Sequence, residues 1–275
     1  MSQIDFILNI VGLLLWLNWR AAESPLKTRP AARSLTLRSA GPPKPQYHYW
    51  TALPLLLLAR AVFYWQAGPP NRWNPQLPLG PLSLSFRSDL FGRMVLFSAL
   101  SFGVALGVFY LWLLVISTVN SRVPDTDPVQ QLVRTWLGRL ERWPTVIKPI
   151  IPTVVAMAVW CAIYPLLTRL GLAPANAWGR IVGQGAVIGL SGYLTLKFVA
   201  MAILALHLFN SYVYLGEFPL WKFVNATARQ LLRPLQWLPL RVWRIDLAPL
   251  VAMALVWVAA EFAGRGLGRL YQNLL

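Results

Sequence analysis

Two long apolar stretches, at residues 94–119 and 181–209, constrain this chain more than any other feature of its sequence. Each exceeds the roughly 20 residues that an α-helix needs to cross a hydrocarbon core about 30 Å thick. With 57% hydrophobic and only 12% charged residues, the chain cannot hide its apolar side chains inside a water-soluble core. We therefore expect a helical membrane protein.

Four shorter apolar stretches, at 6–19, 50–65, 146–167 and 247–263, complete the expected set of spans. Flanking Trp, Tyr and Arg side chains can carry such stretches to the membrane interface. The sequence thus predicts an all-α polytopic membrane protein with six transmembrane helices. The first stretch is the shortest, because its 14 residues rise only about 21 Å in a helix. A cleaved signal peptide is the alternative there, but the chain has Asp5 before this stretch and its positive charges after it.

A sequence pattern that occurs three times pairs the predicted spans into hairpins. Each copy has an apolar segment that ends in Asn, a basic connector, and a Pro that opens the next apolar segment. The pairs are Asn18 and Pro54, Asn120 and Pro152, and Asn210 and Pro249. The second and third copies also share the tetrapeptide Val-Ala-Met-Ala, at 155–158 and 251–254. Such internal repetition predicts a triplicated helical hairpin with interfacial amphipathic helices in its connectors.

The repeat also predicts the organisation of the chain. We expect an N-terminal hairpin of degenerate repeat at 1–66, a Pro-rich outside loop at 67–93, a hairpin at 94–168, a connector at 169–180 and a last hairpin at 181–275. Within the Pro-rich loop, residues 82–86 are expected to be extended.

Positive charge concentrates in the connectors inside the three hairpins. Residues 20–49, 120–148 and 210–246 hold 16 of the 25 Lys and Arg residues. Short loops rich in Lys and Arg resist translocation, so these connectors are predicted to be cytoplasmic and both termini to lie outside. Anionic lipid headgroups are the expected partner of this charge. Direct binding of nucleic acid is the less favoured alternative, because Trp, Leu and Val interleave with the basic residues.

The second connector has the pattern of an amphipathic helix. After Pro128, apolar residues recur at helical spacing and Gln and Arg occupy the other side. We expect this helix to lie in the headgroup region with three residues facing lipid, namely Trp136, Leu140 and Trp143. The alternative is a helix that packs on the protein's own spans. The third connector repeats the pattern at 220–235.

Three charged residues fall inside the expected spans: Arg60, Lys197 and Glu261. An isolated charge in lipid is costly, so each raises a functional hypothesis. Lys197 and Glu261 lie at similar depths and are predicted to pair; a titrating group on an ion path is the alternative. For Arg60, Glu261 is one conceivable partner.

The three hairpin asparagines, Asn18, Asn120 and Asn210, are predicted to cap backbone groups where a helix ends at the interface. A polar site formed by all three together is the alternative.

The sequence contains few residues of the types that carry out catalysis. The chain has two histidines, His48 and His207, and one cysteine, Cys161, which excludes an internal disulfide. We predict no catalytic residue, no metal site and no cofactor, although haem held by both histidines remains an alternative. The segment 189–193 has Tyr193 where a nucleophile elbow needs its last Gly, and is interpreted as small-residue helix packing.

The residues Leu232-Arg233-Pro234, Pro239 and Ile245-Asp246-Leu247-Ala248-Pro249-Leu250-Val251 resemble the YggT family of small bacterial membrane proteins, which is related to the plastid YlmG proteins. The likeness is best over 208–257 and fainter over 118–160. The chain departs from the family pattern at two places: 236–237, where a basic pair is expected, and 242–244, where glycines are expected.

The resemblance implies a non-catalytic integral protein of the bacterial inner membrane. Members are associated with osmotic tolerance, division or morphology, nucleoid distribution in plastids, and maturation of cytochrome b haem. The motif places Arg233, Pro234 and Asp246 at a cytoplasmic helix start. There Asp246 would lie in the first helical turn and anchor the corner, or bind a headgroup, peptide or cofactor.

Together these features favour a membrane scaffold or assembly factor. Its basic amphipathic connectors would bind anionic lipid, a partner membrane complex or a second copy of the chain. A channel or transporter component linked to osmotic or ion balance is the alternative.

Overall fold

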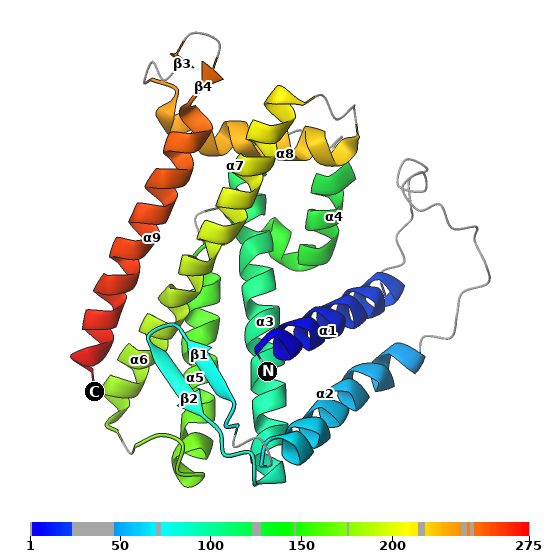
Figure 1. Cartoon of the computed structure of the whole chain (residues 1–275), viewed down its shortest axis with the longest axis vertical. Helices are drawn as coiled ribbons and strands as arrows, with labels where there is room; N and C mark the ends of the chain where they lie inside the picture. Colours follow the sequence, from blue (N-terminus) through cyan, green and yellow to red (C-terminus); the bar gives the residue numbers. More distant parts are fainter. Residues whose placement is uncertain are drawn as a thin grey trace. The chain divides into compact units, whose positions relative to one another are not determined.

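A computed structural model of the chain describes residues 2–23, 47–69, 73–122, 128–145, 147–174, 176–213, 218–237, 241–242 and 245–274. These residues are mostly helical (Figure 1). The α-helices are α1 (Ser2–Glu23), α2 (Tyr47–Ala67), α3 (Phe91–Val119), α4 (Pro128–Leu137), α5 (Ile151–Arg169), α6 (Trp178–Ser191), α7 (Leu196–Tyr212), α8 (Pro219–Leu232) and α9 (Ala248–Gln272). Short 3₁₀ turns are η2 (Asn120–Arg122), η3 (Gly138–Arg142), η4 (Gly192–Thr195) and η5 (Arg233–Leu235).

Four helical segments of the described residues are long and apolar enough to cross a membrane: Phe91–Val119, Ile151–Arg169, Trp178–Tyr212 and Ala248–Gln272. They coincide with four of the six predicted spans, so the chain is an all-α, membrane-embedded protein. The two N-terminal predictions, 6–19 and 50–65, fall in α1 and α2, outside this set. The apolar part of α2, Thr51–Ala67, is shorter than the other four, and α1 carries charge at Asp5 and Arg20.

The chain divides into two compact units inside α3. The first comprises Met1–Leu77 and Leu84–Gly107, and the second comprises Pro78–Ser83 and Val108–Leu275. The division does not follow the predicted repeat boundaries, because the first half of α3 belongs with α1 and α2. In that first unit, the Ser98 hydroxyl of α3 donates to the carbonyl of Leu57 in α2, at 2.8 Å.

Proline positions explain where two of the spans begin. Pro152 and Pro249 lie in the first turns of α5 and α9, where a missing N–H costs nothing and the fixed φ angle suits a helix. These two helix starts are confirmed. Pro54 differs from these two prolines, because α2 begins seven residues earlier, at Tyr47, and Pro54 lies inside it, as the predicted span 50–65 implied.

Close packing of α5 against α6 depends on small residues. A Cβ added at Gly189 would lie 2.9 Å from the Cα and carbonyl oxygen of Thr153, and one at Gly185 would lie 3.1 Å from the Cα of Met157. Small residues four apart let two membrane helices approach this closely. The structure thus confirms the interpretation of segment 189–193 as helix packing.

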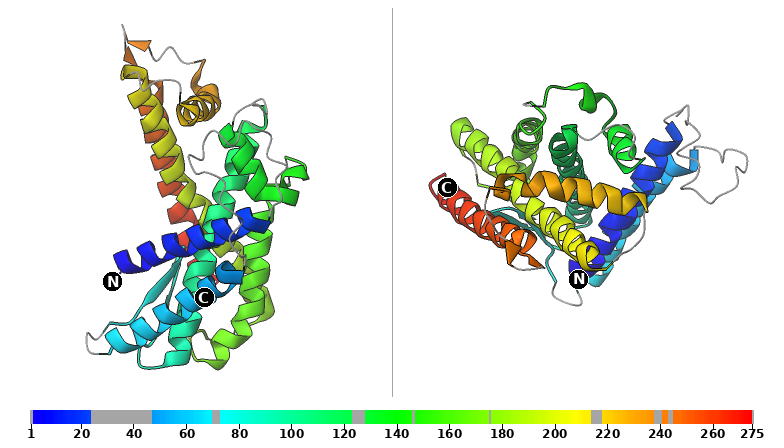
Figure 2. Two further views of the ribbon diagram at one scale, coloured as in Figure 1. Left: turned by 90° about the vertical axis from the view of Figure 1, so that its right-hand side faces the viewer. Right: turned by 90° about the horizontal axis from the view of Figure 1, so that it is seen from above.

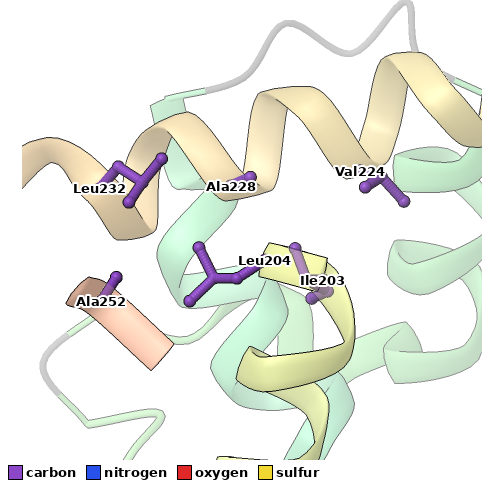
Figure 3. Close-up of a cluster of buried hydrophobic side chains, with 6 residues drawn as sticks. All are labelled: Ile203, Leu204, Val224, Ala228, Leu232 and Ala252. Carbon is purple, nitrogen blue, oxygen red and sulfur yellow. The ribbon is translucent and has the colours of Figure 1, made fainter. Parts of the chain in front are cut away.

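Helix α8 crosses the end of the bundle formed by α7 and α9, which run antiparallel (Figures 1 and 2). Its apolar face is buried, as Figure 3 shows: Val224, Ala228 and Leu232 lie over Ile203 and Leu204 of α7. Ala252 of α9 completes this cluster.

The Pro-rich segment contains a two-stranded hairpin, β1 (Gln76–Leu79) and β2 (Leu82–Ser85), turned at Gly80 with φ +70°. The expected extended piece at 82–86 is therefore confirmed, and β1 is its partner strand. A second, very short pair joins β3 (Arg241–Val242) to β4 (Ile245–Asp246) just before α9.

Candidate functional site

A buried polar cluster lies around Arg60 in the first unit. Arg60 is only 2% exposed and forms an ion pair with Asp5 of α1. Its Nη1 donates to Oδ1 of Asn9 at 2.8 Å, its Nη2 donates to Oγ of Ser101 at 2.8 Å, and its Nε donates to the hydroxyl of Tyr64 at 3.1 Å. Every nitrogen of the guanidinium group thus has a partner, and the partners come from α1, α2 and α3.

The acceptors in this cluster are themselves held in place. The carboxylate of Asp5 accepts from the Tyr64 hydroxyl at 2.9 Å and from the Ser101 hydroxyl at 3.1 Å. Asn9 donates to Ser101 at 3.1 Å. The ring of Phe97 lies 5.8 Å from Cζ of Arg60, within cation–π range. A charge pair satisfied to this degree works as a clamp between helices.

Asp5 is the partner of Arg60, which corrects the suggestion of Glu261. Sequence reasoning missed Asp5 and Asn9 as partners. A signal was available: Asp5 and Asn9 are four apart on α1, and Arg60 and Tyr64 are four apart on α2, so each pair lies on one face of its helix.

The predicted ion pair between Lys197 and Glu261 is not formed among the described residues. Glu261 instead accepts from Nε of Arg265, one turn along α9, at 3.1 Å. Arg265 is the favoured partner over Lys197 of α7, because an i,i+4 pair on one helix does not depend on how a second helix packs. Nζ of Lys197 lies 5.2 Å from the ring centroid of Phe198.

Lys197 lines an open apolar groove in the second unit. The groove has a volume of about 720 Å³ and lies between α3, α6, η4, α7, α8 and α9. Lys197 is the charged residue among the described residues of its lining, and Tyr193 and Thr227 contribute hydroxyls. Both hydroxyls donate within the protein, Tyr193 to the carbonyl of Pro149 and Thr227 to that of Phe223.

Asn120 joins the end of α3 to both amphipathic helices. Its Nδ2 donates to the hydroxyl of Thr227 on α8 at 2.8 Å and to Oε1 of Gln130 on α4 at 3.4 Å, and all three side chains are buried. The side chain therefore bonds other side chains, and the prediction of a backbone cap is wrong at this residue. Asn210 is partly buried near the end of α7, and Asn18 is exposed on α1.

The apolar face of α4 packs against the protein. Val133 and Leu137 are buried against α3, and Leu140 packs on the same cluster. The ring of Trp136 lies 6.1 Å from that of Phe109. The lipid-facing prediction is therefore corrected for Trp136 and Leu140, since α3 offers an apolar surface that competes with lipid. Trp143 is 47% exposed.

Glu141 gathers part of the positive charge of the second connector. It accepts from the hydroxyl of Ser117 at 2.6 Å and lies 3.2 Å from Nζ of Lys148 and 3.5 Å from Nε of Arg134. The connector is thereby tied to α3, and these two cations are turned toward the protein.

The outer face of α8 keeps its charge exposed. Lys222, Arg229 and Arg233 are exposed, and Trp237 just beyond them is 81% exposed. Arg233 is the C-cap of α8 and Pro234 follows it in η5, so the Arg-Pro turn does end a helix.

Asp246 lies in β4, where its backbone pairs with Arg241. It precedes the N-cap of α9, Leu247, and the first turn of α9 holds no acidic residue. The prediction that Asp246 belongs to that first turn is wrong, because pairing with β3 delays the helix start. The side chain of Asp246 lies outside the described part of the chain.

His207 and Cys161 lie apart from any cluster of metal ligands among the described residues. Nδ1 of His207 on α7 lies 2.8 Å from Oδ1 of Asn225 on α8, so the imidazole joins these helices. The side chain of His48 is outside the described part. Cys161 is a free thiol on α5. Among the described residues, no three His, Cys, Asp or Glu side chains gather as a metal site would require.

The chain matches no protein-family model, no curated protein and no solved structure. The YggT resemblance stays a prediction from the motif residues.

Proposed function

We propose that the protein is a non-enzymatic membrane scaffold or assembly factor whose basic α8 surface binds anionic headgroups or an acidic face of a partner membrane complex. The observation that carries this proposal is that α8 has one buried apolar face and one exposed basic face. Its apolar face is buried on α7 and α9, while Lys222, Arg229 and Arg233 are exposed on its other side.

The position of α8 suits this role. A helix at the hydrocarbon boundary holds its cations at the depth of lipid phosphates, where each Lys or Arg contributes about 1 kcal/mol of attraction to an anionic leaflet. The exposed indole of Trp237 is of the kind that anchors at this depth. Together these side chains form a fixed, positively charged surface.

Charges inside the apolar helices support a scaffold over a transporter. Arg60 is neutralised by Asp5, and Glu261 is paired with Arg265. A transport path needs polar groups that exchange partners with a passing ion, whereas the guanidinium group of Arg60 is held by buried bonds within the protein. A channel or transporter component is the alternative function, and the tests below distinguish it from a scaffold.

The proposal includes a location and a topology. The protein belongs to the bacterial cytoplasmic membrane, as the YggT resemblance implies, with the α8 side in the cytoplasm. The clamp between Asp5 and Arg60 neutralises the N-terminal pair of helices, so that α1 and α2 can enter lipid as a hairpin. Six inserted helices and external termini then follow.

Native mass spectrometry with added phosphatidylglycerol tests the proposal. Replacing three cations, as Lys222→Gln/Arg229→Gln/Arg233→Gln, removes roughly 3 kcal/mol of attraction, or about a hundredfold in lipid affinity. The matched control replaces three exposed arginines away from α8, as Arg169→Gln/Arg180→Gln/Arg269→Gln, and we expect it to bind as the wild type does.

Equal binding by the two triple variants would contradict the headgroup role. Ion flux through vesicles that contain only the purified protein, abolished by Glu261→Gln, would replace the scaffold proposal with the transporter reading.

A further inference from the structure

The groove around Lys197 combines apolar walls with one charged side chain among its described lining residues. We infer that it binds a transmembrane helix of a separate protein that carries a carboxylate at mid-span, opposite Lys197. The inference rests on the proposed scaffold function and names the kind of partner that the scaffold holds.

The depth of Lys197 follows from the packing of α7 on α9. Leu204 of α7 meets Ala252 of α9 in one buried cluster. The two helices are antiparallel (Figure 1), so Lys197, seven residues before Leu204, is level with Ala259, seven residues after Ala252. Ala259 lines the same groove. It is 11 residues from Ala248 and 13 from Gln272, or about 17 and 20 Å from the ends of α9.

A cation at this depth needs an anion at this depth. An isolated charge near the bilayer centre is costly, and a lysine side chain is too short to reach the phosphates from there. Within the described residues Lys197 has the ring of Phe198 as a neighbour and no carboxylate, because Glu261 is taken by Arg265. A lipid headgroup stays at the interface, whereas a carboxylate on a spanning helix can lie opposite Lys197.

The lining of the groove suits a helix. Along one wall, α9 presents small residues, Ala259, Ala260, Ala263 and Gly266, and α7 adds Ala200. Small side chains allow the backbone of a second membrane helix to approach closely. The wall from Val256 to Leu270 covers 14 residue steps, about 21 Å, which is a large part of a spanning helix.

The probe is a synthetic Leu- and Ala-rich transmembrane peptide with one central Glu and a dansyl group, in phosphatidylcholine vesicles with the full-length protein. Energy transfer from the protein's Trp residues to dansyl reports association. A peptide with central Gln is the matched control. We expect the Glu peptide to associate at least tenfold more tightly than the Gln peptide.

Substitutions at two positions assign the contact. Lys197→Met should abolish the preference for Glu, and Lys197→Glu should transfer it to a peptide with central Lys, which also shows that the variant is folded. Ala260→Phe fills the groove and should weaken association of the Glu peptide at least tenfold. Ala254→Phe changes an exposed position of α9 outside the groove and should leave it unchanged.

Several results would overturn the inference: equal association of the Glu and Gln peptides, a preference for Glu that survives Lys197→Met, or equal association when the Glu is moved to the end of the peptide. A phospholipid that the peptide cannot displace from the wild type, but that Ala260→Phe releases, would identify a lipid site instead. A dimer of the wild type that Lys197→Met dissolves would identify a second copy. Since the vesicles contain no anionic lipid, failure here is separate from failure of the headgroup role of α8.

Discussion

Arg60 illustrates how one buried charge is made compatible with an apolar helix. Its guanidinium group is held by Asp5, Asn9, Tyr64 and Ser101, which come from three different helices. In a low-dielectric environment an unpaired member of such a network is far more costly than a satisfied one. The cluster should therefore contribute to the stability of the first unit only while it is complete.

Asp5→Asn should lower the free energy of unfolding by about 3 kcal/mol, because it leaves the charge of Arg60 buried and uncompensated. Replacing both members, as Asp5→Leu/Arg60→Met, should recover most of the loss. Unfolding in mixed micelles with increasing dodecyl sulfate, followed by circular dichroism, measures both. Asp89→Asn is the matched control, since it breaks an exposed pair with Arg87. Equal losses at the two aspartates would contradict the role of the clamp.

The charge of Arg60 could be located from the sequence, whereas the spacing of Asp5 and Asn9 indicated only a polar face on α1 and did not identify the partner. Hydropathy identifies a cation in an apolar stretch, whereas its pairing with Asp5, 55 positions away in the chain, depends on how α1 and α2 pack. The same limit applies to Lys197 and Glu261. Equal depth made their pairing plausible, but rotation about the helix axes decides it, and Arg265 was within one turn of Glu261.

Among the helices, α4 and α8 show what periodicity can and cannot predict. The spacing of apolar residues located both helices and the buried face of each. It could not say whether lipid or protein covers that face, because a stripe of one width fits either surface. In the structure, protein covers this face at Trp136, whose ring packs on Phe109. The prolines were more specific, since Pro152 and Pro249 fit a first turn.

Replacing a glycine by alanine should change the free energy of unfolding in opposite directions at Gly189, in the contact between α5 and α6, and at Gly103 of α3, which has an open space. Gly189→Ala should lower the free energy of unfolding by about 1–3 kcal/mol, because the new Cβ meets the backbone of Thr153. Gly103→Ala, in the interior of α3, should raise it by about 0.5 kcal/mol, because its Cβ meets no atom within 4 Å and Ala is the better helix former. The same unfolding titration measures both, and a stabilising Gly189→Ala would contradict the close approach of the two helices.

For the molecule as a whole, hydropathy and length predicted four spanning segments correctly, because a long apolar helix has no stable alternative outside lipid. The N-terminal helices were harder, since their polar residues are compensated only in the folded unit. In the proposed topology, the spans place the η2 and α8 side in the cytoplasm and the start of α6 outside.

Cysteine labelling in intact cells tests this claim most directly. Ser121 in η2 and Ala177 before α6 are both exposed, so Ser121→Cys and Ala177→Cys in a Cys161→Ala background report on the two sides. With a membrane-impermeant maleimide, we expect labelling of Ala177→Cys in intact cells and of Ser121→Cys only after lysis. Labelling of Ser121→Cys in intact cells would contradict it.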